Sequence, residues 1–274
     1  MTTLLFTERW TFGGVDLSTF ARLVRSTDGV DDAPPLRGED AIYGGLPGRR
    51  HLAKLEDGRQ LGLAIWIQGT DADGVVTEPT EAEQARVNLD AFQIVLGRRY
   101  QQELVRIMPD GSERVALAEC IDWQAIKEHD AGSGILGGVA DFWLADPWFY
   151  GDEITSADYV PASPTDFTLA HPGTVHGHRV TLDLLGPITD PRVTNQANGI
   201  YVEYDGEVAA TKHLAIDCEA FTAENDGVNC IGDIAHSGAY EWLRIEPGDN
   251  TIRVTGSGLS EATKLVLTFR PPYR

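Results

Sequence analysis

One glycine-rich segment has the residue spacing that nucleotide-binding proteins use. Gly132, Gly134 and Gly137 match the pattern GxGxxG. That pattern binds a pyrophosphate only after a strand and at the start of a helix, because backbone N–H groups must point at the phosphates. Here it follows a charged stretch, and Pro147 would end any helix soon after it began. We therefore expect a loop or a hairpin tip rather than a nucleotide site.

Three histidines, His171, His176 and His178, come nearest to a metal-binding cluster. Their spacing matches no known zinc pattern and no cysteine lies near them in the sequence, so we expect a solvated loop and no bound metal. Cys218 and Cys230 could approach each other across two strands. We expect them to be buried free thiols, because unpaired cysteines behave as small apolar side chains.

The sequence contains no motif for a catalytic nucleophile, neither Gly-x-Ser-x-Gly nor His-Glu-x-x-His. It has 42 acidic residues, so almost any fold would bring some pair of carboxylates to the separation that glycosidases need. The presence of such carboxylate pairs therefore does not indicate a glycosidase. We expect no enzymatic activity and no cofactor.

The composition is that of a soluble, acidic protein. Its 274 residues include 42 acidic and 22 basic side chains, which gives a formal net charge of −20. An acidic surface repels phosphate backbones and anionic lipid, so we expect no stable nucleic-acid binding and no membrane insertion. The longest apolar stretch, Leu61–Ile67, is far shorter than the ~20 residues that span a bilayer. Three cysteines are too few for a disulfide framework and suit a reducing cytosol.

Two segments of the N-terminal half have clear periodicities. The first alternates apolar residues with a second face, as a strand with one buried side does, at Leu61, Leu63, Ile65 and Ile67. The second predicts a helix over residues 80–96, capped by Thr80 with Glu83 and ended by Gly97. Its apolar stripe, which we expect to pack on that strand, comprises Ala85, Leu89, Phe92 and Leu96. A weaker helix or turn is expected near Asp122–Glu128.

The C-terminal half predicts strands alone. A polar stretch with two prolines, from about residue 150 to 166, is the best candidate for a linker. Turn signals then separate short apolar runs: Phe167–Ala170, Arg179–Leu185, Ile200–Tyr204, Leu214–Asp217, Tyr240–Ile245, Thr251–Thr255 and Leu265–Arg270. Seven short strands without helices favour a sandwich or a jelly roll.

An aromatic cluster precedes the linker and comprises Phe142, Trp143, Trp148, Phe149 and Tyr150. Such side chains could stack on sugars or bind a partner protein. At the edge of a domain they also suit a hydrophobic plug between two domains, which is the interpretation that we favour.

Taken in order, these motifs resemble the siphophage distal tail proteins. The opening Trp10–Leu17 is similar to their start, and so are Arg37–Arg49 and Leu55–Arg59. A helix, an Asp-Pro-aromatic segment and two closing runs then occupy corresponding places: 80–96, Asp146–Tyr150, Ile245–Gly256 and Leu265–Tyr273. The resemblance covers nearly the whole chain, and it is the order of the motifs that gives it weight.

The resemblance implies a mainly β fold with two domains. Residues 1–150 would form a ring-forming, tail-tube-like β-barrel or sandwich with one helix at 80–96. Residues 151–165 would be a linker. Residues 166–274 would form a galectin-like β-sandwich of the jelly-roll type.

The resemblance also implies a structural role without catalytic residues. Six copies would form a ring at the distal end of a long non-contractile tail. The ring would join the tail-tube protein to the tail-tip hub or tail-associated protein, and receptor-binding proteins would be further partners. DNA would pass through the ring without stable binding. The expected location is the tail tip of the virion, after assembly in the host cytoplasm.

Two other interpretations remain. The first is a carbohydrate-binding protein or glycosidase with a glycan groove in its jelly roll. The second is a tail-tube subunit, which the second domain argues against. The mass of the assembled protein separates the ring former from a lectin or hydrolase, which has no need to assemble.

Overall fold

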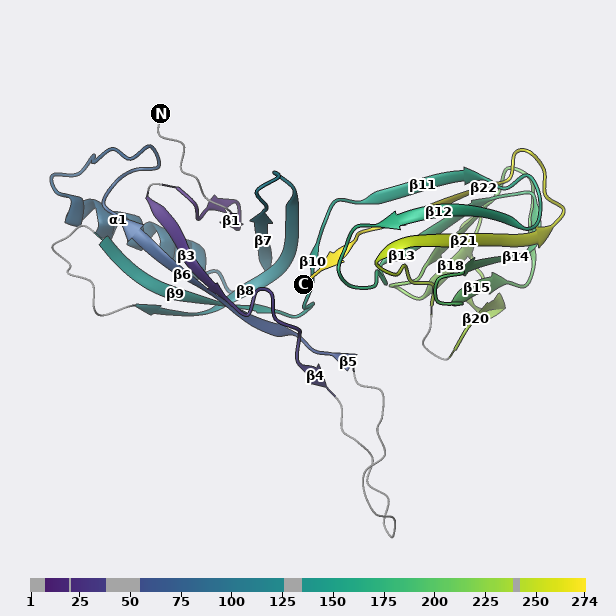
Figure 1. Cartoon of the computed structure of the whole chain (residues 1–274), viewed down its shortest axis with the longest axis horizontal. Coiled ribbons are helices and arrows are strands. Elements are labelled where there is room, and N and C mark those ends of the chain that lie inside the picture. The colour runs from purple at the N-terminus through teal and green to yellow at the C-terminus, as the bar shows by residue number, and fades with distance from the viewer. Residues whose placement is uncertain (1–7, 20, 38–54, 126–134, 239–241) are drawn as a thin grey trace, which may run out of the picture. The chain divides into compact units, whose positions relative to one another are not determined.

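The computed structural model describes residues 8–19, 21–37, 55–125, 135–238 and 242–274. Over these residues the protein is mainly β, with a single α-helix (Figure 1). The chain divides into two compact units, Met1–Phe149 together with Arg274, and Tyr150–Tyr273. We call them unit 1 and unit 2. Within the described part of the chain, no helix is long and apolar enough to cross a membrane.

Unit 1 is built on one antiparallel sheet whose strands follow the order β2-β1-β7-β8-β9-β6-β3. The strands are β1 (Arg9–Phe12), β2 (Val15–Asp16), β3 (Arg22–Asp28), β6 (Arg59–Gln68), β7 (Gln102–Ile107), β8 (Glu113–Ala125) and β9 (Ile135–Leu144). A separate pair is formed by β4 (Leu36–Arg37) and β5 (Leu55–Glu56). The short strand β10 (Phe149–Tyr150) contains the last residue of the continuous part of unit 1 and the first residue of unit 2. All the pairings along the path from β2 to β3 are antiparallel.

The buried face of β6 forms the centre of the unit 1 core. The four apolar residues that alternate along this strand are each at most 1% exposed: Leu61, Leu63, Ile65 and Ile67. In the register with β9, Leu61 pairs with Phe142 and Leu63 with Ala140. Both partners are fully buried, so the two strands present one continuous apolar face.

The helix α1 (Glu81–Leu96) covers that face and contacts both β6 and β9. Thr80 caps it, because its Oγ1 accepts a hydrogen bond from the backbone N–H of Glu83 at 3.2 Å and donates one to the Glu83 carboxylate at 3.0 Å. Of the expected stripe, three residues are buried and Leu89 is half-buried; the buried ones are Ala85, Phe92 and Leu96. Gly97 follows with a right-handed φ of −73°, so the helix ends without a left-handed glycine.

The expected helix or turn near Asp122–Glu128 is wrong in its described part. Residues up to Ala125 continue β8, and the rest of the segment lies outside the described residues. A β-bulge between Cys120 and Asp122 breaks the alternation of this strand, which is why the pattern did not read as β. Of the glycine-rich motif, Gly137 lies inside β9 rather than at the start of a helix, and Gly132 and Gly134 lie outside the described residues.

Unit 2 consists of two antiparallel sheets around one apolar core. The first sheet has the order β11 (Ile154–Tyr159), β22 (Lys264–Phe269), β13 (Val180–Leu185), β17 (His213–Asp217), β18 (Thr222–Asn225) and β19 (Val228–Asn229). The second has the order β12 (Thr165–His171), β21 (Gly248–Ser257), β14 (Ile188–Asn195), β15 (Tyr201–Tyr204) and β20 (Ile234–His236). Smaller elements are β16 (Glu207–Val208), the 3₁₀ turn η1 (Ile231–Asp233) and β23 (Pro272–Tyr273). Side chains from both sheets meet in the core, as in a β-sandwich.

The segment expected as a linker, residues 151–165, contains a strand. Residues Ile154–Tyr159 form β11 and pair along their whole length with β22. This strand lies at the edge of its sheet and its side chains are half-buried or exposed. An edge strand needs little apolar material, so its polar sequence is compatible with a loop or with a strand.

Two further segments differ from expectation. The run Tyr240–Ile245 is not a strand in its described residues, and only Ile245 forms a bridge, with Gly177. In contrast, β14 was not expected, because Pro191 lies in its middle. A β-bulge accommodates this proline, and Asp190 beside it takes a left-handed φ of 50°.

Candidate functional site

The outward side of α1 carries apolar residues that no described part of the chain covers. Val87 is 48% exposed and Ile94 is 71% exposed, and Ala91 between them is exposed as well. Their spacing of four and three residues places them on one stripe of the helix. We call Val87, Ala91 and Ile94 the outer stripe. The helix is therefore apolar on two sides, one facing its own sheet and one facing solvent.

A hollow of about 280 Å³ adjoins the C-terminal end of this helix. It is lined by residues of α1, of the turn after it and of β8, among them Gln93, Leu96, Arg99, Ile121 and Trp123. Ile121 is the extra residue of the β8 bulge and is 49% exposed. Bulges commonly re-aim a side chain in this way. The outer stripe, Ile121 and this hollow form the candidate assembly surface of unit 1.

The hollow offers no reactive group. Cys120 lines it, but burial raises the pKa of the Cys120 thiol to about 11. The thiol donates a weak hydrogen bond to the backbone oxygen of Asp122 at 3.4 Å. Because only the thiolate is nucleophilic, this cysteine stays inert at neutral pH. The surface is suited to packing rather than to chemistry.

Two buried arginines, which the sequence reasoning missed, fix the loop after β3. Arg106 is 5% exposed; its guanidinium binds the Glu8 carboxylate at 2.8 Å and the Asp31 carboxylate at 2.9 Å. Burial alone would lower the pKa of Arg106, but the bonds to Glu8 and Asp31 raise it. Arg59 donates to the backbone oxygens of Val30 and Asp32, each at 3.1 Å. Neither position shows a sequence signal, because a strand arginine normally faces solvent.

Most of the aromatic cluster is buried. Phe142, Trp148, Phe149 and Tyr150 are at most 6% exposed, and Trp143 is 38% exposed. Phe142 packs edge-on against Phe12, with ring centroids 4.8 Å apart, and Phe149 against Trp10 at 6.0 Å. These contacts place Phe142 and Phe149 in the core of unit 1. The expected role of the cluster between two domains, or toward a partner, stays a prediction.

The three histidines have different surroundings. His171 is buried, and its Nδ1 accepts a hydrogen bond from the backbone N–H of Gly173 at 2.8 Å. The rings of His176 and His178 are 6.4 Å apart. Across the described residues, no group of three or more His, Cys, Asp or Glu side chains could hold a metal ion. Cys218 and Cys230 are buried free thiols in the core of unit 2.

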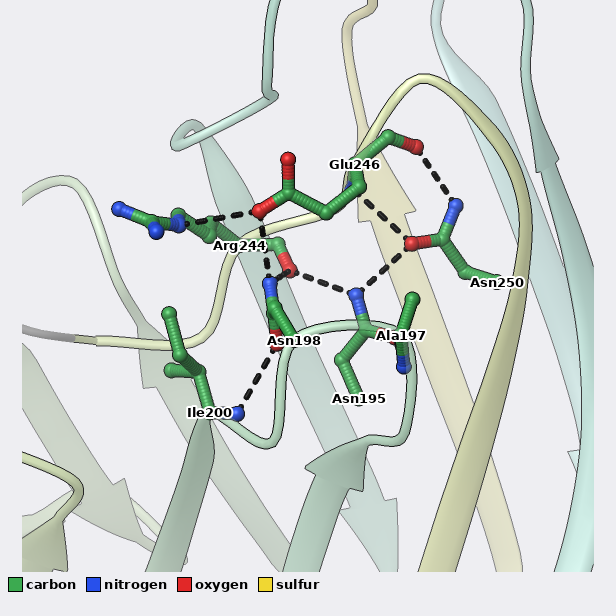
Figure 2. Close-up of polar contacts among 7 residues, drawn as sticks. All are labelled: Asn195, Ala197, Asn198, Ile200, Arg244, Glu246 and Asn250. Atoms are coloured by element: carbon green, nitrogen blue, oxygen red, sulfur yellow. Dashed lines mark hydrogen bonds and ion pairs between the residues drawn. The ribbon is translucent and has the colours of Figure 1, made fainter.

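Buried asparagines hold the irregular segment before β21 in place (Figure 2). Asn250 is fully buried; its Oδ1 accepts from the side chain of Asn195 at 2.8 Å and from the backbone N–H of Glu246 at 2.9 Å. Its Nδ2 donates to the backbone oxygen of Glu246 at 2.7 Å. Asn195 also donates to the backbone oxygen of Arg244 at 3.0 Å. We call this set of contacts the asparagine network.

The network extends to the turn between β14 and β15. Asn198 donates to the Glu246 carboxylate at 2.9 Å and accepts from the backbone N–H of Ile200 at 2.9 Å. Arg244 donates to the same carboxylate at 3.2 Å. Side chains thus satisfy backbone groups that would pair with a neighbouring strand in a sheet. The described part of Tyr240–Ile245 can therefore stay irregular, although its apolar residues predicted a strand. The signal in the sequence is the pair of asparagines in a turn, which favours such bonds.

Comparison with known protein families finds a match within unit 2. Residues 173–273 match the family of the siphovirus-type tail component, C-terminal domain. This match makes residues 173–273 the part of the chain that is similar in sequence to siphovirus tail components. It takes in the strands β13 to β23 and the whole asparagine network. No curated protein matches the sequence.

Solved structures extend the likeness to the whole chain. The SPP1 Dit protein, described as a paradigm of the hub adsorption apparatus in phages that infect Gram-positive bacteria, is 14% identical and has a TM-score of 0.66. The match covers 98% of this chain and 100% of that one, so the two share a fold. Chains of the phage p2 baseplate in its activated conformation, with Sr and with Ca, match with TM-scores of 0.41 and 0.40. Their identities are 9% and 8%, and each match covers 97% of this chain and 98% of the other. The tail-component domain and the fold shared with SPP1 Dit confirm the resemblance to the distal tail proteins.

Proposed function

We propose that this protein is a structural component of the tail tip of a phage with a long non-contractile tail. Six copies form a ring at the distal end of the tail, and the ring connects the tail-tube protein to the hub used in host attachment and DNA ejection. The observation that carries the proposal is the match of residues 173–273 to the siphovirus-type tail component family. The fold shared with SPP1 Dit, a hub protein, supports the place in the tail.

Self-assembly draws support from the surface of unit 1. A monomer gains nothing from an apolar stripe on the solvent side of its one described helix, since exposed apolar patches usually mark an interface. The outer stripe and Ile121 would supply the apolar centre of a contact between neighbouring copies, with the adjoining hollow receiving a side chain of the next copy. We infer that residues 1–145 make most of the ring contacts.

The acidic charge suits passage of DNA without binding. The chain carries a net charge of −20. We infer that carboxylates of unit 1 predominate on the inner wall of the ring, where they would repel the phosphate backbone. The protein would act as a scaffold without catalysis, in the virion tail tip after assembly in the host cytoplasm, with receptor-binding proteins among its neighbours.

A charge placed in the outer stripe tests the proposal. Ile94→Lys should abolish ring formation while the variant stays folded, because Ile94 is 71% exposed and its side chain supports no described core. Val228→Lys is the matched control, since Val228 is 68% exposed but lies in unit 2. Native mass spectrometry would compare both variants with the parent chain. Equal assembly of the parent and the Ile94→Lys protein would refute the proposed surface.

A further inference from the structure

A second apolar surface of unit 1 lies on the strands β7, β8 and β9. Leu117 of β8 is 53% exposed and Trp143 of β9 is 38% exposed. In the strand registers, Val105 pairs with Val115, two residues before Leu117, and both valines are half-buried. Trp143 pairs with Glu119, two residues after Leu117. Because side chains alternate along a strand, the four apolar residues share one face of the sheet. We call Val105, Val115, Leu117 and Trp143 the outer sheet patch.

The outer sheet patch faces away from α1. The residues that alternate with it along β8 and β9, among them Ala116, Ala118 and Phe142, are at most 3% exposed. Phe142 pairs with Leu61 on the face that α1 covers, so its neighbour Trp143 points to the opposite face. The outer stripe lies on the side of α1 that is turned away from the sheet. The two apolar surfaces therefore lie on opposite sides of unit 1, with the helix and the sheet between them.

The outer sheet patch is flanked by carboxylates. Glu103 of β7 is exposed and pairs directly with Leu117. Glu119 of β8 is half-buried and pairs directly with Trp143. Both carboxylates lie on the same face as the apolar residues, since they occupy alternate positions of the same strands. A partner of this surface should therefore be apolar in its centre and basic at its rim.

The side of α1 that carries the outer stripe has that character. Between residues 86 and 99 the sequence contains three arginines and one acidic residue, Asp90, which gives this segment a net charge of +2 in a chain of net charge −20. The three arginines, Arg86, Arg98 and Arg99, are all exposed. Arg99 also lines the hollow at the end of the helix. The outer stripe is thus an apolar surface with a basic rim.

The symmetry of a ring requires two different surfaces on each copy. A head-to-tail contact joins one surface of a copy to another surface of the next copy, and repetition closes the ring. A contact between two identical surfaces uses both of them up and stops at a dimer. A ring built on the outer stripe therefore needs a complementary surface elsewhere on the chain, and the outer sheet patch is apolar, of opposite rim charge and on the opposite side of the same unit.

We propose that the outer sheet patch of one copy packs on the outer stripe of the next copy. Leu117 then enters the hollow beside Ile121 and Trp123, and the Glu103 carboxylate faces the Arg99 guanidinium. This inference rests on the proposed ring and names the second surface that closes it. Two outer stripes in contact with each other fit less well, because their arginines would repel one another.

Complementary variants test this arrangement, because a head-to-tail contact can be broken from either side. Ile94→Lys alters the outer stripe and Leu117→Lys alters the outer sheet patch, so each variant keeps the other surface intact. Both side chains are more than half exposed, so the fold should tolerate the lysine. Native mass spectrometry would compare the parent chain, each variant alone and an equimolar mixture of the two. Val228→Lys is the matched control, since Val228 is an exposed apolar residue of unit 2.

Each of the two variants alone should be monomeric, whereas their mixture should form dimers with one chain of each kind and no larger particle. The dimer joins the intact outer stripe of one variant to the intact outer sheet patch of the other. The mixture is measured at chain concentrations well above those at which the parent assembles, because a single contact lacks the mutual support of a closed ring. The Val228→Lys protein should assemble like the parent.

Charge reversal tests the rims of the two surfaces. A chain with both Glu103→Arg and Glu119→Arg should assemble with a dissociation constant at least tenfold higher than the parent, because like charges then face each other. A chain with both Arg98→Glu and Arg99→Glu should show the same loss. A chain with all four substitutions should assemble again, because the attraction returns with its signs exchanged. The losses should be larger at low than at high salt concentration.

A Leu117→Lys protein that assembles like the parent would overturn the inference and leave the proposed ring in place. So would a mixture of Ile94→Lys and Leu117→Lys that stays monomeric, or a fourfold charge variant that stays dissociated. A parent chain that never assembles would refute the proposed function, and the inference with it. The two failures are therefore distinguished by the parent chain.

Discussion

The indole ring of Trp123 lies directly over Gly138, so that a Cβ at position 138 would overlap the ring. Trp123 belongs to β8 and Gly138 to β9. The indole ring of Trp123 also packs edge-on against Phe92 of α1, with ring centroids 5.6 Å apart. The absence of a side chain at one glycine therefore positions the tryptophan that borders the candidate assembly surface.

We predict that Gly138→Ala destabilises the protein by about 1–3 kcal/mol, the usual cost of overpacking a buried site. The added methyl group must displace the indole ring of Trp123 or the β9 backbone. Denaturant unfolding measures this cost. Gly232→Ala is the control, because nothing lies within 4 Å of a Cβ at that position. Equal stability of the two variants would show that the indole moves aside freely.

Replacing Phe92 tests the packing of α1 on its sheet. Phe92 is fully buried, and Phe92→Ala should reduce the free energy of unfolding by about 3–5 kcal/mol. Val87→Ala, on the exposed side of the same helix, should change it little. A melting temperature unaffected by Phe92→Ala would mean that the helix does not bury this face.

The asparagine network should matter for the stability of unit 2. Asn250→Ala leaves the buried amide of Asn195 and the backbone N–H of Glu246 without their shared acceptor. The expected loss is about 1–3 kcal/mol for each buried group left unpaired. Gln196→Ala changes an exposed residue of the adjoining turn and serves as the control in the same chemical unfolding experiment. If both variants lost similar amounts of unfolding free energy, the asparagine network would not stabilise unit 2 more than an ordinary surface residue does.

Acid should weaken the protein through His171. Burial lowers the pKa of His171, with the nearby Glu246 charge opposing this shift and His176 adding to it. The ordinary pKa is ~6.5, so the unfolded chain takes up the proton first as the pH falls. The contribution of this group to stability is thus complete above about pH 6.5 and declines below it.

The variant His171→Asn keeps an acceptor for the Gly173 N–H but does not titrate. Its unfolding free energy should fall less between pH 7 and pH 5 than that of the parent chain. Gln196→Ala, which replaces an exposed side chain that does not titrate, should retain the parental slope. Identical slopes for the parent and His171→Asn would assign the acid sensitivity to other groups.

Sequence patterns predicted those elements whose signal is local. The alternation along β6 and the cap at Thr80 are both properties of neighbouring residues, and both positions behave as the patterns indicate. Sequence patterns did not predict those strands whose formation depends on residues far away in the sequence. The edge strand β11 is polar because only one strand pairs with it, and β14 tolerates Pro191 because a bulge takes up the proline.

The candidate assembly surface was hidden from the sequence for a related reason. The exposure of Ile121 depends on a bulge in the register of β8 with β9, which nothing local to this residue marks. The outer stripe of α1 was readable in principle at Val87 and Ile94, since both lie at helical spacing. Its exposure could not be inferred, because an apolar residue on a helix usually packs inward.

The mass of the assembled protein tests the central claim most directly. Native mass spectrometry of the purified chain, alone and with the tail-tube protein, would report the number of copies in each particle. The account predicts a particle of six 29.9 kDa chains, lost in Ile94→Lys and retained in Val228→Lys. A chain that stays monomeric under both conditions, or that assembles only through a surface that Val228→Lys destroys, would contradict it.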